Sequence, residues 1–60
     1  MSQKVLIVED DSNIAELLHL YLEKEGYRVV MAGSLGGGRV LYRQEKPDAV
    51  LLDLNLPDGD

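Results

Sequence analysis

Two short apolar runs stand out along the chain, one near each end. The first is Lys4–Val8 and the second is Ala49–Asp53. Neither run alternates between apolar and polar positions, a pattern typical of strands that are covered on both faces within a parallel sheet. The second run lies between two Pro-Asp turns and ends on Asp53, whose carboxylate is costly to bury without a partner. We therefore predict two buried parallel strands, and a simpler role for Asp53 as the cap of a turn stays open.

Between these runs the apolar positions change to helical spacing. Over Ser12–Glu25, apolar residues recur three and four positions apart in one stripe, and Gly26 follows as a helix stop. The stripe consists of Ile14, Leu17, Leu18, Tyr21 and Leu22. We predict a helix whose stripe packs in the core, with His19 as a surface residue on the other side.

A second strand is predicted at Tyr27–Ala32, and a short helix at Arg39–Lys46 that ends before Pro47. The intervening segment, Gly33–Gly38, favours a flexible loop. A phosphate-cradling loop is the alternative, but the Lys-Ser/Thr pair that a P-loop requires does not follow. Because each helical glycine costs about 1 kcal/mol relative to alanine, we expect this helix to start late or fray.

The order strand, helix, strand, helix, strand predicts an α/β fold. Two right-handed crossovers, one on each side of the first strand, place that strand in the middle of a three-stranded parallel sheet with the order 2-1-3. The two helices then lie on opposite faces, as in a doubly wound half-domain.

Composition narrows the function classes. Sixty residues form at most one small domain, and the absence of cysteine excludes disulfides and thiolate zinc sites. A net charge of -5 argues against a nucleic-acid surface and favours cationic or metal-bearing partners. No apolar run approaches the roughly 18 residues of a membrane span, and no signal-peptide core is present, so we expect a cytoplasmic protein without membrane contact.

Acidic residues follow the first and third predicted strands. Glu9 and Asp10 come directly after the first strand, and Asp53 ends the third. The carboxyl ends of neighbouring parallel strands share one edge of the sheet, so these three carboxylates are expected to converge. Such an all-oxygen set suits Mg²⁺, and a carboxylate oxygen of Asp53 could accept a phosphoryl group. Asp11 or Ser12 is expected to cap the following helix.

Three stretches, VLIVEDD, ELLHLYLEKEGYRVVMA and KPDAVLLDLNLPDGD, resemble the first half of a response-regulator receiver domain of two-component signalling. The resemblance implies a flavodoxin-like fold, with Asp53 as the phospho-acceptor. It also implies that Glu9, Asp10, Asp53 and the backbone carbonyl of Asn55 bind Mg²⁺. The family's phosphoryl donor is a phosphohistidine on a sensor histidine kinase, and the receiver itself is not expected to be an enzyme.

The resemblance covers residues 1–60 as a truncated receiver domain, because two further strands and three helices of the family lie beyond Asp60. The lysine that pairs with the phosphoryl group and the Ser/Thr that senses it belong to that part, so phosphotransfer is expected to be impaired. A non-catalytic half-domain is the main alternative, a homodimer formed through the outer edge of the third strand or by exchange of elements through Gly36–Gly38. A nucleotide-binding fragment that uses the glycine segment is the third hypothesis.

Overall fold

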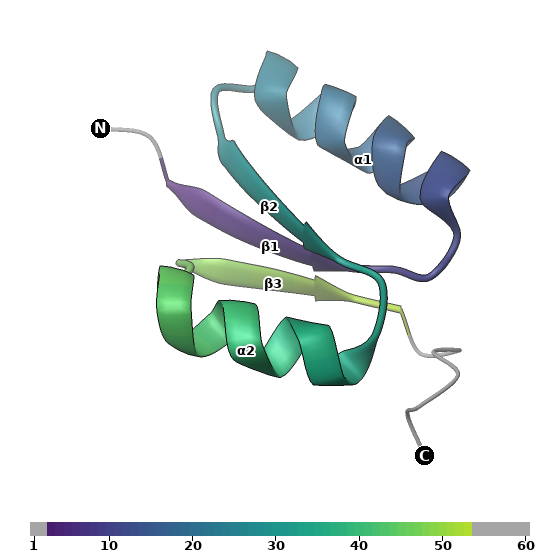
Figure 1. Cartoon of the computed structure of the whole chain (residues 1–60). Helices are drawn as coiled ribbons and strands as arrows, with labels where there is room; N and C mark the ends of the chain where they lie inside the picture. The colour runs from purple at the N-terminus through teal and green to yellow at the C-terminus, as the bar shows by residue number, and fades with distance from the viewer. Residues whose placement is uncertain (1–2, 54–60) are drawn as a thin grey trace.

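The structure is a computed structural model in which residues 3–53 are described. Its elements are β1 (Lys4–Val8), α1 (Ser12–Lys24), β2 (Arg28–Ala32), α2 (Leu35–Glu45) and β3 (Ala49–Leu52). The strands are parallel in the order β2-β1-β3, and the two helices lie on opposite sides of the sheet (Figure 1). The predicted α/β architecture and the strand order are confirmed. Neither helix within residues 3–53 is long and apolar enough to cross a membrane.

The core is built around β1, the central strand. Its residues Val5–Val8 are buried, and Leu6 and Ile7 are 1% and 0% exposed. Side chains alternate between the two faces of a strand. Accordingly, Leu6 and Val8 pack with Leu35 and Leu41 of α2 on one face. The unbroken apolar pattern of β1 therefore reflects burial on both faces, as predicted.

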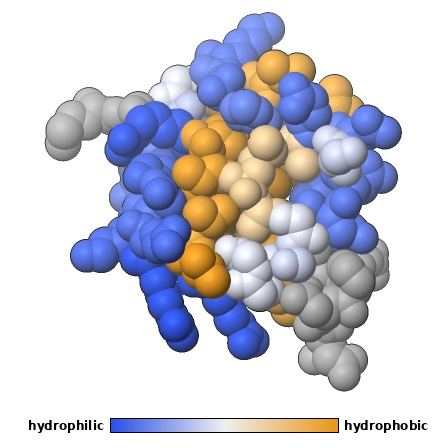
Figure 2. Space-filling model, in the orientation of Figure 1, coloured by the Kyte–Doolittle hydropathy of each residue, from blue (hydrophilic) through white to orange (hydrophobic). Residues whose placement is uncertain are grey.

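β3 differs from the prediction of a buried strand. Its residues Val50, Leu51 and Leu52 are 41%, 40% and 50% exposed. The physical reason is the placement of the helices, because α1 and α2 pack on β1 and β2 and, in the described part of the chain, neither helix packs closely on β3. Apolar side chains consequently gather between the two helices, over the region where β3 lies in Figure 1 (Figure 2).

The apolar stripe of α1 is also less buried than predicted. The side of α1 that packs on the sheet is centred on Ala15, which is buried, and on Leu18 and Leu22, which are half-buried. The exposed members of the stripe are Ile14, Leu17 and Tyr21, at 46%, 67% and 62%. The stripe is thus wider than the strip of helix that contacts β1 and β2. His19 is half-buried rather than a free surface residue, with its Nε2 atom 3.0 Å from Oε2 of Glu23.

The start of α2 corrects another expectation. The helix begins at Leu35 and includes Gly36–Gly38, so these glycines are helical and do not form a phosphate-cradling loop. Ser34 caps the helix by accepting a hydrogen bond from the Gly37 N–H at 3.1 Å. Gly38 is buried, and a Cβ atom added to it would lie only 2.9 Å from Cγ2 of Val8. The absence of a side chain therefore lets α2 approach β1 closely, and this packing offsets the low helix propensity of glycine.

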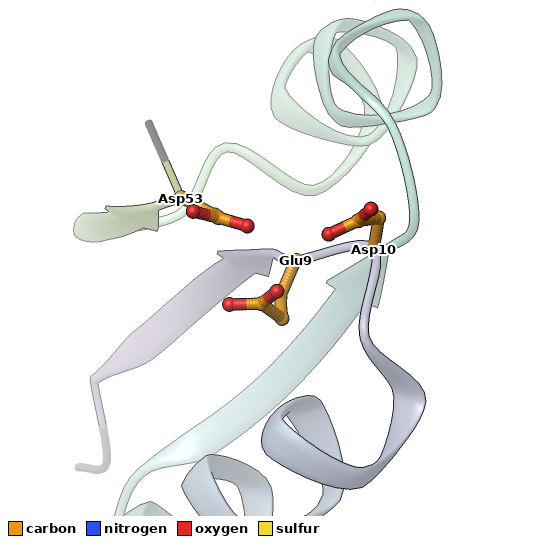
Figure 3. Close-up of side chains that lie close together, drawn as sticks. All are labelled: Glu9, Asp10 and Asp53. Atoms are coloured by element: carbon orange, nitrogen blue, oxygen red, sulfur yellow. The ribbon is translucent and has the colours of Figure 1, made fainter. Parts of the chain in front are cut away.

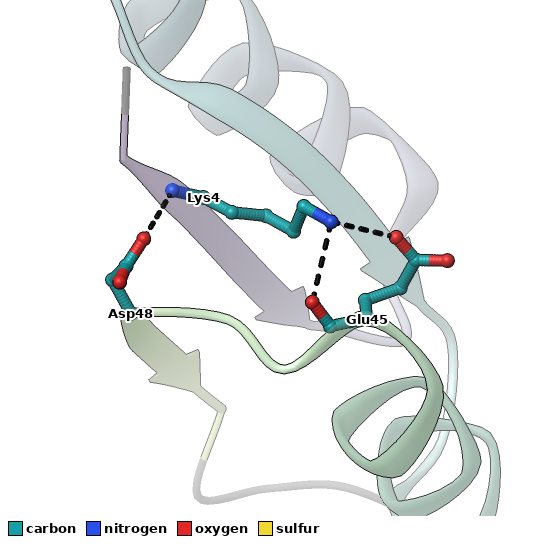
Figure 4. A network of polar contacts seen from close by, with 3 residues as sticks. All are labelled: Lys4, Glu45 and Asp48. Carbon is teal, nitrogen blue, oxygen red and sulfur yellow. Dashed lines mark hydrogen bonds and ion pairs between the residues drawn. The ribbon is translucent and has the colours of Figure 1, made fainter. Parts of the chain in front are cut away.

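A polar network joins the start of β1 to the connection between α2 and β3 (Figure 4). The Lys4 Nζ group donates to the Glu45 carboxylate at 2.9 Å and to the Glu45 backbone carbonyl at 3.2 Å, at the C-terminal end of α2. The Lys4 backbone N–H donates to the Asp48 carboxylate at 2.8 Å, and the Asp48 N–H donates back to the Lys4 carbonyl at 2.7 Å. These contacts fix where β3 begins relative to β1.

Replacing Lys4 by methionine is expected to lower the free energy of unfolding by about 1 kcal/mol. The substitution keeps the apolar stem but removes both hydrogen bonds to Glu45, and partial exposure of the pair limits the loss. Lys24→Met is the matched control, because the structure gives Lys24 no ion pair among the described residues. Urea denaturation followed by circular dichroism measures both. Equal midpoints for the two variants would contradict a stabilising role for the network.

Candidate functional site

Three carboxylates meet at the C-terminal edge of the sheet. Glu9 and Asp10 follow β1, and Asp53 follows β3 directly. The hydrogen bonds of the parallel sheet continue past the ends of β1 and β3. The Glu9 N–H donates to the Ala32 carbonyl at 3.0 Å, and the Asp53 N–H donates to the Val8 carbonyl at 2.9 Å. The main chain of Glu9 and of Asp53 is therefore held by the sheet itself.

The three side chains lie close enough to share one cation. One oxygen of each carboxylate lies within 4.8 Å of the corresponding oxygens of the other two. The Asp53 and Asp10 carboxylates point toward each other, with the Glu9 carboxylate beside them (Figure 3). Glu9 and Asp53 are half-buried, and Asp10 is exposed. An all-oxygen donor set on a partly open edge fits Mg²⁺, which retains several waters and takes few protein ligands.

Electrostatics at this edge also favour a cation. The hydrogen bond from the Asp11 N–H is the largest single influence on the pKa of Glu9, and it lowers that pKa. Desolvation, the hydrogen bond and negative charge of Asp53, and a hydrogen bond with Asp10 act in the opposite direction, and together they raise the pKa of Glu9 above its ordinary value. The acidic cluster is thus electrostatically unfavourable when all three groups are ionised.

Asp53→Asn is expected to bring the pKa of Glu9 down toward its ordinary value, because it removes the nearby negative charge. A carboxyl with a raised pKa in the folded state adds stability below its unfolded pKa. That contribution is lost as the pH rises through the folded pKa. In the wild type without metal, the free energy of unfolding should therefore decrease as the pH rises from the ordinary pKa of Glu9 to its raised pKa. In Asp53→Asn this decrease should be smaller. Carbon-13 titration of the Glu9 carboxyl measures the pKa, with Asp48→Asn as the control. An unchanged Glu9 titration in Asp53→Asn would contradict the coupling.

A shallow hollow of about 220 Å³ adjoins the acidic cluster. Besides Glu9 and Asp53, its lining is apolar: Ile7, Val8, Leu18, Leu51 and Leu52. No lysine or arginine of residues 3–53 lines it. Lys4 is held by Glu45 at the other end of β1, so this lysine is not available to the carboxylates.

The structure thus brings together three of the four residues predicted for the metal site. Asn55 lies outside the described residues, and its predicted role as a carbonyl ligand stays a prediction. Sequence reasoning predicted Asp11 or Ser12 as the helix cap, and the structure shows that Asp11 is the cap, but the contact of Asp11 with Glu9 was missed. The acidic run Glu9–Asp11 contains no spacing signal that would reveal this hydrogen bond, because it depends on how the chain turns from β1 into α1.

Comparison with known proteins agrees with this geometry. Residues 5–60 match the response regulator receiver domain family. The chain belongs to this family. Receiver domains generally bind Mg²⁺, and the acidic cluster described above provides suitable oxygen ligands.

Several relatives match this chain over most of its length. The transcriptional regulatory protein YxdJ of Bacillus subtilis (strain 168) is 49% identical over 57 residues, which are 95% of this chain and 25% of that protein. The KDP operon transcriptional regulatory protein KdpE of Escherichia coli (strain K12) is 48% identical over 56 residues, 93% of this chain and 25% of that protein. The non-phosphorylated HemR receiver domain from Leptospira biflexa superposes with a TM-score of 0.89 at 42% identity, covering 98% of this chain and 48% of that one. The chain therefore spans about a quarter of the length of these curated relatives.

Proposed function

We propose that this chain is a phosphoryl-accepting receiver segment of a two-component response regulator, with Asp53 as the acceptor. The observation that carries the proposal is the convergence of Glu9, Asp10 and Asp53 at one edge of the sheet, within 4.8 Å of one another. Glu9 and Asp10 would hold Mg²⁺ together with Asp53, and the Asn55 carbonyl would complete the protein ligands. Mg²⁺ would neutralise charge on the phosphoryl oxygens when bound.

The chemistry assigned to Asp53 is a direct displacement. An ionised oxygen of Asp53 attacks the phosphorus of the donor, and the bond between phosphorus and the donor's leaving group breaks as the acyl phosphate forms. The Asp53 N–H donates to the Val8 carbonyl at 2.9 Å, in continuation of the sheet hydrogen bonds. The sheet therefore holds the main chain that carries the attacking carboxylate. The receiver is the acceptor in this reaction, and we propose no enzymatic turnover for it.

We expect transfer to these 60 residues to be slow. Charge on the moving phosphoryl oxygens needs a positioned cationic group, and no lysine or arginine among the described residues lines the hollow beside Asp53. Loss of one such group costs on the order of 10² or more in rate.

The donor proposed here is the phosphohistidine of a sensor histidine kinase, as family membership suggests. YxdJ and KdpE are transcriptional regulatory proteins, and the regulatory output belongs to those longer proteins. For this chain we propose the receiving step alone, which a small phosphodonor can test without knowledge of the kinase.

Acetyl phosphate provides that test. The chain incubated with acetyl phosphate and Mg²⁺ should gain the mass of one phosphoryl group, and EDTA should prevent the gain. The label should be lost in hydroxylamine, which cleaves acyl phosphates but leaves phosphoserine and phosphotyrosine intact. Labelling that is equally strong in EDTA, or that resists hydroxylamine, would contradict an Mg²⁺-dependent aspartyl phosphate.

A self-assembling half-domain is the second candidate function, and the exposure of β3 favours it. Among the described residues β3 pairs only with β1, and Val50, Leu51 and Leu52 remain 40–50% exposed. An unpaired strand edge with apolar side chains on both faces favours pairing with another chain. We propose a symmetric dimer of the 60-residue chain through this edge.

Light scattering across a dilution series tests the dimer. The expected result is a dimer mass at high concentration, with a loss of helical circular dichroism as the dimer dissociates. Val50→Lys, a substitution on β3, should weaken the dimer. The variant dimer should then dissociate at a higher protein concentration than the wild-type dimer does. A folded monomer at all concentrations would contradict this second function and would leave the phosphoryl-acceptor proposal unaffected.

A further inference from the structure

Asp11 makes contacts in two directions at the junction between β1 and α1. Its side chain caps α1, with Oδ1 accepting hydrogen bonds from the N–H groups of Asn13 at 2.9 Å and Ile14 at 3.2 Å. Its own backbone N–H donates to Oε2 of Glu9 at 3.2 Å. One residue therefore connects the first turn of the helix to a carboxylate of the acidic cluster.

The backbone conformation explains how both contacts coexist. Asp11 is extended, with φ -83° and ψ 110°, as is usual for a helix N-cap. In this conformation the side chain reaches forward over the first turn while the N–H is directed back toward the end of β1. The cap hydrogen bonds hold Asp11 in that conformation, and through it they restrain the Glu9 carboxylate.

We infer that Asp11 is a positioning residue for the Mg²⁺ site, coupling the N-terminal cap of α1 to the orientation of Glu9. This inference rests on the proposed function, because it assumes that Glu9 binds Mg²⁺. Groups that orient a metal ligand through a hydrogen bond commonly change metal affinity by 10- to 100-fold when removed. The coupling is reciprocal, so bound Mg²⁺ must also stabilise the first turn of α1.

Two substitutions at Asp11 separate its cap from its charge. Asp11→Asn and Asp11→Ala both remove the negative charge, but only asparagine retains a capping oxygen. The Mg²⁺ dissociation constant, measured from amide shifts of Glu9 and Asp10, should therefore be about tenfold higher for Asp11→Ala than for Asp11→Asn.

Ser34→Ala is the matched control, because it removes the cap of α2 and, within residues 3–53, no hydrogen bond joins the Ser34 side chain to Glu9, Asp10 or Asp53. This variant should lose stability as Asp11→Ala does, yet bind Mg²⁺ with the affinity of the wild type. Equal affinities for Asp11→Ala and Asp11→Asn would overturn the inference, and so would an equal weakening in Ser34→Ala.

The wild type provides a second measurement should Asp11→Ala fail to fold. Adding Mg²⁺ should slow hydrogen exchange at the amides of Asn13 and Ile14, which Asp11 caps, more than at the amide of Gly37, which Ser34 caps. Equal slowing at all three amides would overturn the coupling.

If the wild type shows no Mg²⁺ response at all, the proposed metal site fails and the inference fails with it. Mg²⁺ binding without a difference between Asp11→Asn and Asp11→Ala refutes the role of Asp11 alone.

Discussion

Asp53→Asn is expected to abolish phosphoryl labelling by acetyl phosphate. The amide has no ionised oxygen to attack phosphorus, while its size preserves the geometry at the end of β3. The Asp53 N–H bond to Val8, at 2.9 Å, is a main-chain contact and survives the substitution. Mass spectrometry of the intact chain, followed by mapping of the labelled peptide, measures the effect.

Asp48→Asn is the matched control for this experiment. Asp48 precedes β3 and contacts Lys4 at the opposite edge of the sheet, and asparagine retains an oxygen that can accept the 2.8 Å hydrogen bond. This variant should be labelled at the rate of the wild type. Labelling that persists in Asp53→Asn would show that another residue is the acceptor.

Gly38→Ala and Gly37→Ala are expected to change stability in opposite directions. A Cβ at Gly38 would lie 2.9 Å and 3.3 Å from the two methyl carbons of Val8, a branched side chain with little freedom to move. The close contact with Val8 should cost about 1–3 kcal/mol, which outweighs the gain in helix propensity of about 1 kcal/mol. Gly38→Ala should therefore lower the free energy of unfolding by about 1 kcal/mol. At Gly37 the nearest atoms are 3.4 Å and 3.6 Å away, so alanine should stabilise by up to about 1 kcal/mol.

Urea denaturation of both variants measures the difference. A double-mutant cycle with Val8→Ala tests the cause, because removing the two methyl groups should relieve the cost of Gly38→Ala. Equal stabilisation by both alanines would show that α2 does not need a glycine to approach β1. The explanation given above for a glycine-rich helix would then be wrong.

The strand order followed from the sequence because it depends on few choices. The unbroken runs at Lys4–Val8 and Ala49–Asp53 favoured parallel strands, and right-handed crossovers leave one arrangement in which β1 is central. The convergence of Glu9, Asp10 and Asp53 followed from the same rule, since parallel strands end at one edge. These predictions used only the direction of the strands.

Packing between elements was not accessible in the same way. Helix propensity alone predicts that α2 starts late or frays at Gly36–Gly38, whereas the contact of Gly38 with Val8 comes from tertiary structure. The exposure of Leu17 depends on which part of the apolar stripe contacts β1 and β2. Periodicity predicts which residues form the stripe, but it does not predict which of them contact the sheet. The hydrogen bond from Asp11 to Glu9 depends on one turn of the backbone.

A Mg²⁺ titration followed by amide NMR tests the central claim most directly, namely that the three carboxylates form one cation site. The predicted result is that millimolar Mg²⁺ shifts the amides of residues 9–11 and 53 more than those at the opposite edge, such as Lys4 and Asp48, and that Asp10→Asn weakens the response. The contradicting result is the absence of localised shifts at millimolar Mg²⁺, or shifts that Asp10→Asn leaves unchanged.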